Sequence, residues 1–201
     1  MREKRARIMW LTIVAILVIV GSFYFLRSGQ NTTGAMNLPQ DFIIARQNAA
    51  VVSQRIVDLT SATRDKINAA NISELAGDNN KTQQFIGEAR TTNNEAYQSA
   101  SNLAEFLKNL AGSLSTLQST ASQRIAYQAI ATELSLVSEF IVYTQNLNSF
   151  LDALSAAGEG NTPARKTAIE ATLKKTNNSA RIINDLNKEF LSRMASFDKS
   201  L

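Results

Sequence analysis

An uncharged run of nineteen residues near the N-terminus, residues 8–26, constrains this chain more than any other feature. It reads IMWLTIVAILVIVGSFYFL, and its only clearly polar side chains are Thr12 and Ser22. A helix of this length spans roughly 28 Å, close to the hydrocarbon thickness of a bilayer. Because a core helix of this length usually carries a polar stripe, the run predicts a transmembrane helix rather than a buried one.

The charges on either side of the run indicate its orientation. The basic residues that precede it are Arg2, Lys4, Arg5 and Arg7. Only Arg27 follows it directly. The positive-inside rule therefore predicts that residues 1–7 are cytoplasmic. The bulk of the chain is expected to be extracytoplasmic, either periplasmic or at the cell surface.

A cleaved signal peptide is the alternative interpretation of the same run. Such a peptide has an apolar region of about 7–15 residues and ends at a small-x-small site. This run is longer and ends in bulky aromatic residues. The aromatic side chains expected at the two membrane interfaces are Trp10 on the inner side and Phe23, Tyr24 and Phe25 on the outer side. We favour an uncleaved signal anchor.

The excess positive charge of the chain lies beside this run. Five of the 21 basic residues and one of the 17 acidic residues fall within residues 1–27, so 16 of each remain beyond it. A nucleic-acid interface needs a basic patch on the folded domain, and the remaining sequence predicts none. We expect the juxtamembrane charges to contact membrane lipid and expect no nucleic-acid partner.

Cysteine and histidine are both absent from the sequence. This composition excludes disulfides, thiolate chemistry, the usual zinc sites, haem ligation through histidine and a Ser-His-Asp triad. The sequence also predicts no glycine-rich phosphate loop and no pair of carboxylates on a helix seam. We therefore expect no catalytic residues, no cofactor, no metal ligands and no enzymatic activity.

Beyond a short polar tether at residues 27–38, apolar residues recur at spacings of three and four, which is the pattern of amphipathic helices. Gly77 predicts a helix C-cap, and Thr162 followed by Pro163 predicts a helix start. Short connections between long helices favour antiparallel neighbours. The sequence therefore predicts an all-α, up-down-up-down four-helix bundle over residues 39–201, with helices at 39–76, 80–119, 122–156 and 163–201.

The boundary between the second and third helices has the least sequence support, because no glycine or proline marks it. Residues 119–123 are rich in hydroxyl groups, and Thr120 with Gln123 has the spacing of a capping box. The alternative is one continuous helix of about 75 residues.

The third helix carries two adjacent apolar stripes, although an ordinary bundle helix needs a face only about 100° wide. One hypothesis is that this helix is simply the most buried of the four. The other is that part of it forms a docking surface, since aromatic residues are enriched at interface hot spots. The candidate partner surface consists of Phe140, Tyr143 and Phe150.

Four threonines occupy seam positions at similar distances from the membrane-distal turns. They are Thr63, Thr92, Thr144 and Thr176. In the predicted topology they form one layer roughly 22 Å below the distal end. Either each hydroxyl bonds to a carbonyl of its own helix, or the layer holds water or a small polar ligand.

An inner anchor followed by an extracytoplasmic helical bundle resembles, in architecture over residues 8–201, the ligand-binding domains of bacterial chemoreceptors. The resemblance implies a sensor-like function but assigns no ligand residue. Because no second apolar span or signalling region precedes Leu201, any signal is expected to pass through a partner.

Two function hypotheses follow from these patterns. The favoured one is a structural or interaction subunit that docks on another membrane or envelope protein, or on itself. The alternative is a ligand-binding accessory domain that takes a small molecule and reports to a partner. The first predicts an apolar stripe beyond what the bundle buries, whereas the second predicts a polar defect or cavity inside the bundle.

Overall fold

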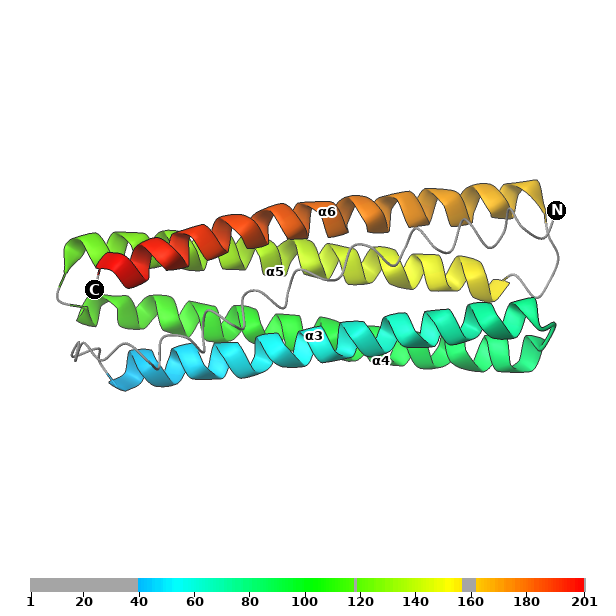
Figure 1. The fold of residues 1–201 in the computed structure, drawn as a ribbon, viewed down its shortest axis with the longest axis horizontal. Coiled ribbons are helices and arrows are strands. Elements are labelled where there is room, and N and C mark those ends of the chain that lie inside the picture. Colours follow the sequence, from blue (N-terminus) through cyan, green and yellow to red (C-terminus); the bar gives the residue numbers. More distant parts are fainter. Residues whose placement is uncertain (1–39, 118, 157–161, 201) are drawn as a thin grey trace.

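The structure is a computed structural model that describes residues 40–117, 119–156 and 162–200. The predicted membrane span, its flanking charges and the tether lie outside the described residues. Within them the chain forms four long helices and one short 3₁₀ turn (Figure 1), namely α3 (Gln40–Leu75), α4 (Asn79–Ser113), η2 (Leu114–Thr116), α5 (Thr120–Ser155) and α6 (Pro163–Ser200). The prediction of an all-helical four-helix bundle is confirmed.

The turn from α3 to α4 is closed by backbone hydrogen bonds around Gly77. This residue has φ 78°, a conformation that favours glycine. Its N–H donates to the Glu74 carbonyl at 3.0 Å, and the Asp78 N–H donates to the Ser73 carbonyl at 2.9 Å. Asp78 then caps α4 by accepting a hydrogen bond from the Lys81 N–H at 3.0 Å. The predicted C-cap at Gly77 is confirmed, and it reverses the chain within three residues.

The junction between α4 and α5 is a real break. Leu117 (φ −70°, ψ 137°) and Ser119 are both extended, so the hypothesis of one continuous helix is wrong. The capping residue of α5 is Ser119, one position before the Thr120 that the capping-box spacing indicated. Its Oγ accepts from the Ser122 N–H at 3.2 Å. The Gln123 Nε2 instead donates to the Leu117 carbonyl at 2.7 Å, which holds the connection against α5.

Cross-helix hydrogen bonds show that successive helices are antiparallel. At one end of the bundle the Ser122 Oγ donates to the Ser200 carbonyl at 2.9 Å, joining the start of α5 to the end of α6. At the other end the Gln83 Nε2 donates to the Ser155 carbonyl at 3.0 Å, joining the start of α4 to the end of α5. The up-down-up-down order follows from these pairings.

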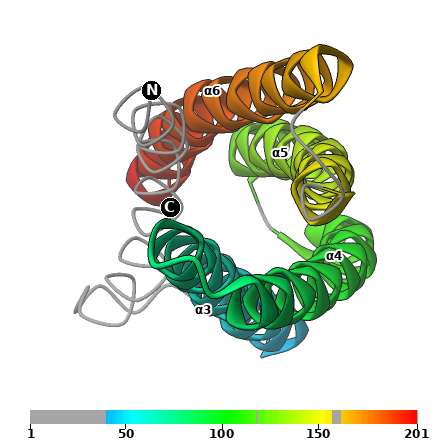
Figure 2. The ribbon, with the colours of Figure 1, turned by 90° about the vertical axis from the view of Figure 1, so that its right-hand side faces the viewer.

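The four helices do not pack equally. Backbones approach closely between α3 and α4, between α5 and α6, and less extensively between α4 and α5, whereas α3 and α6 approach only sparsely. The end-on view shows the resulting arc, with α3 and α6 on either side of its open part (Figure 2). At the end where α3 begins, Phe42 meets Phe197 with ring centroids 5.9 Å apart.

The most apolar helix, α5, lies between α4 and α6. Among the described residues it is the one helix long and apolar enough to cross a membrane, with a mean hydropathy of 1.3 in its most apolar window. Many of its apolar side chains belong to the core, because both of its neighbours pack on it, whereas Tyr127 and Val142 are exposed. Core helices share this property with membrane spans, so it adds little to the argument for a membrane.

Candidate functional site

One carboxylate lies inside the bundle. Glu133 of α5 is only 8% exposed. It belongs to a seam whose members alternate at spacings of three and four, namely Ile130, Glu133, Val137, Phe140, Thr144, Leu147 and Leu151. This spacing puts Glu133 on the same helix face as its apolar neighbours. Its carboxylate oxygens are not among the fully buried side-chain atoms that lack a hydrogen-bond partner in the described residues.

Two small cavities adjoin Glu133, each with a volume of ≈ 30 Å³. Both are also lined by Phe190 of α6. The first draws side chains from all four helices, including Phe42, Arg46 and Leu110, and the second continues along the bundle past Ser53. A cavity needs about 10–15 Å³ of such space to hold one water, so each has room for about two.

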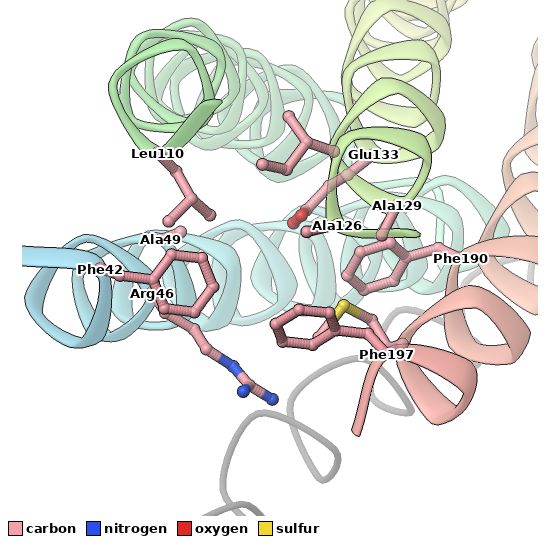
Figure 3. Close-up of a pocket in the computed structure, with 11 residues that line it drawn as sticks. Phe42, Arg46, Ala49, Leu110, Ala126, Ala129, Glu133, Phe190 and Phe197 are labelled. Carbon is pink, nitrogen blue, oxygen red and sulfur yellow. The ribbon is translucent and has the colours of Figure 1, made fainter. Parts of the chain in front are cut away.

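The close-up of the first cavity shows how the charged groups lie (Figure 3). Glu133 extends from α5 into the interior, whereas the guanidinium of Arg46 points away from it. Arg46 Nη2 lies 3.6 Å from Asp198 Oδ1, which ties the beginning of α3 to the end of α6. The positive charge of Arg46 acts on two carboxylates, those of Glu133 and Asp198, but it forms an ion pair only with Asp198.

Burial controls the protonation of both acids. It raises the pKa of Glu133 to about 7, and the charge of Arg46 offsets only part of that rise. Burial also raises the pKa of Asp198, although Arg46 again opposes the shift. When both acids are ionised, this group of three side chains carries one uncompensated negative charge.

The arrangement is chemically able to bind a small group. A desolvated carboxylate next to space for a few atoms can hold a proton, a water or a small cation. No group of three or more acidic side chains that could hold a metal ion occurs in the described residues.

This site was not predicted from the sequence. The sequence predicted no pair of carboxylates on a seam, and the two apolar stripes of the third helix were defined without the acid that lies between them. The available signal was the position of Glu133, three residues after Ile130 and four before Val137, in a seam whose other members are uncharged. A helical pattern locates such a residue on a face, but does not show that the face is covered.

The candidate partner surface lies in the core. Phe140, Tyr143 and Phe150 are 2%, 5% and 1% exposed. The rings of Phe140 and Tyr143 pack with centroids 5.7 Å apart, and burial raises the pKa of the Tyr143 phenol above its ordinary value. The docking-surface hypothesis is therefore corrected, because α5 buries residues of both stripes between its neighbours. It is the most buried helix, as the other hypothesis had it.

The four seam threonines bond to their own helices. Thr63, Thr144 and Thr176 are buried, and Thr92 is half-buried. Their hydroxyls donate to carbonyls three or four residues earlier at 2.7–3.0 Å. These bonds satisfy the hydroxyl donors without water or a ligand, so the threonines give no support to a ligand layer. Buried side chains that do bond across helices near this level are Asn93, between α4 and α5, and Ser179, which accepts from Asn146 of α5.

The remaining predicted site residues lie outside the described residues: Arg2, Lys4, Arg5 and Arg7 for topology, and Trp10, Phe23, Tyr24 and Phe25 for the membrane interfaces. Comparison with known proteins adds no assignment, since no family model, curated protein or solved structure matches this chain.

Proposed function

We propose that this chain is a membrane-anchored, extracytoplasmic helical bundle that binds a small ligand between its helices and reports to a partner protein. The observation that carries the proposal is Glu133, a carboxylate that is only 8% exposed and lines two cavities inside the bundle. Moving a carboxylate largely out of water lowers stability, so the presence of Glu133 in a helix seam favours a role in binding. It is the kind of polar defect that distinguishes a ligand-binding bundle from a purely structural one.

The surface gives less support to a purely structural subunit. Large exposed apolar residues on the described surface are few: Ile44, Val51, Ile72, Leu75, Tyr127 and Val142. On α3 a face repeating every seven residues would join Ile44, Val51 and Ile72. That face is interrupted by the exposed Asp58 and Asp65, so it is not a continuous apolar stripe.

The membrane anchor and its orientation rest on residues 8–26 and the basic residues before them. Protease added outside intact cells should digest residues 28–201 while the span stays attached to the membrane. Protection of the bundle until the membrane is opened would contradict this orientation.

Ligand binding is tested with the full chain in lipid nanodiscs. Thermal unfolding is followed with separate panels of small cations, anions and neutral polar compounds at matched ionic strength. At least one compound should raise the melting temperature of the wild type and of Glu139→Gln, but not that of Glu133→Gln. Glu139 is the matched control because it lies on α5 but lines neither cavity. The absence of any stabilising compound would contradict the proposal.

A docking subunit remains the second candidate because of one feature at the end of α3. Ile72 and Leu75 are 67% and 53% exposed, next to the turn at Gly77. If this tip contacts a partner, changing both residues to serine should abolish crosslinks to that partner in native membranes without lowering the melting temperature. Unchanged crosslinks would exclude the tip as the contact.

A further inference from the structure

We propose that the ligand at Glu133 is a small organic cation with an ammonium group, held by the carboxylate against phenylalanine side chains. This inference rests on the ligand-binding function proposed above and names the class of ligand.

The charges around the cavities favour a cation. Glu133 lines both cavities, Arg46 lines the first, and Asp198 pairs with Arg46. The α4 side chains that line the cavities, Ala100, Leu103 and Leu110, are apolar. Nothing on α4 therefore balances the second carboxylate. One bound positive charge would neutralise the group.

The walls of the first cavity favour an organic cation over a hydrated metal ion. Its apolar wall includes Phe42, Phe190, Met194 and Phe197. None of these side chains has an oxygen that could replace the water molecules a metal ion loses on binding. Aromatic faces attract ammonium groups, and the carboxylate can accept their N–H hydrogen bonds. An alkylammonium satisfies both the apolar wall and the charge.

The volume restricts the size of the bound group. Each cavity of ≈ 30 Å³ holds about two waters, which matches an ammonium group with one or two carbons. A larger substituent would have to extend toward the side where α3 and α6 approach only sparsely. Methylammonium is therefore the appropriate probe.

A proton competes with the cation for the same carboxylate. Because the pKa of Glu133 is about 7, the carboxylate is mostly ionised at about pH 8 and mostly protonated at about pH 5. Cation binding is expected to be stronger at the higher pH, and bound methylammonium should lower the pKa of Glu133 by linkage.

The experiment compares methylammonium chloride, sodium chloride and methanol in concentration series with the full chain in nanodiscs. At about pH 8, methylammonium should raise the melting temperature of the wild type by about 3 °C or more beyond the sodium chloride control. Methanol should give no such rise. The effect should persist in Glu139→Gln, disappear in Glu133→Gln and shrink at about pH 5.

A second measurement uses only the wild type, so that it does not depend on the folding of a variant. The carboxyl ¹³C signal of Glu133 is titrated by NMR with and without methylammonium, and its midpoint should fall when the cation is present. An unchanged midpoint together with an unchanged melting temperature overturns the proposal. So does a rise in melting temperature that persists in Glu133→Gln.

The outcomes separate the ligand class from the function. If methylammonium fails but an anionic or neutral compound stabilises the chain in a Glu133-dependent manner, the ligand class is wrong and the binding function stands. If no compound of any class stabilises it, both proposals fail.

Discussion

The side-chain amide of Asn93 on α4 donates to the backbone carbonyl of Thr144 on α5 at 2.8 Å. The same Nδ2 donates to Asn148 Oδ1 at 2.9 Å. Asn93 is only 2% exposed, so these bonds form away from bulk water. They join the α3–α4 hairpin to the α5–α6 hairpin at their shared α4–α5 interface and help to set the register between the two helices.

Replacing Asn93 by alanine should therefore destabilise the bundle. The change removes both hydrogen bonds and leaves a void in the core, at an expected cost of about 1–3 kcal/mol in the free energy of unfolding. Urea denaturation measures this cost. Gln98→Ala, at an exposed position of the same helix, is the control and should change stability little. If both substitutions changed the free energy of unfolding equally, the hydrogen bonds of Asn93 would not contribute to stability.

Stability should fall as pH rises through the titration of Glu133. The pKa of this buried acid is raised from 4.5 to about 7, so between these values the folded state holds a proton that the unfolded state has lost. The stabilisation is fully present below about pH 4.5 and is lost as pH rises to about 7, by an amount on the order of 3 kcal/mol. Glu133→Gln should remove most of this slope in urea denaturation measured between about pH 5 and pH 7.

The range of about pH 5 to pH 7 is chosen to separate the titration of Glu133 from that of other acids with shifted pKa values. Burial raises the pKa of Asp198, so it contributes a slope of the same sign, which should remain in Glu133→Gln. The pKa values of Asp78 and Glu88 are lowered, by hydrogen bonds to Lys81 and Lys66 respectively. These two acids act in the opposite sense, below their ordinary pKa values, and therefore outside the range measured. An identical slope in the wild type and Glu133→Gln would contradict the assignment.

Substituting Tyr143 and Phe150 by serine should unfold or strongly destabilise the bundle. Both rings are buried, and truncating a buried aromatic side chain typically costs about 3–5 kcal/mol. Thermal unfolding measures the loss, and Val142→Ser, at an exposed position of α5, is the control. A double variant with an unchanged melting temperature but lost self-association or partner binding would restore the docking-surface hypothesis.

Replacing Thr63 and Thr176 together by valine should leave stability within about 1 kcal/mol of the wild type. Each hydroxyl donates only to its own helix, and valine preserves the shape of the side chain. Urea denaturation of the full chain checks this, with the two single variants alongside. A loss of several kcal/mol would mean that the hydroxyls hold ordered water or a ligand after all.

The number, length and order of the helices could be predicted from the sequence because their causes are local. Spacings of three and four define the seams, Gly77 permits the left-handed turn that ends α3, and Pro163 begins α6 at a position where its missing N–H costs nothing. The break before α5 was harder to locate. Thr120 and Ser119 have equally suitable hydroxyls, and only the extended backbone at Leu117 and Ser119 decides which one caps the helix.

The candidate site depended on tertiary packing. A helical pattern gives the direction of each side chain around its own axis, but not how much of the surface neighbouring helices cover. Because both α4 and α6 pack against α5, the covered face is wide enough to bury Phe140, Tyr143 and Phe150. From the sequence alone, these three side chains could equally have been exposed on a docking surface. The same packing encloses Glu133, whose charge would favour solvent on an isolated helix. Local periodicity therefore determined which residues share a face, and the approach of the other helices decided that this face holds a buried carboxylate beside two cavities.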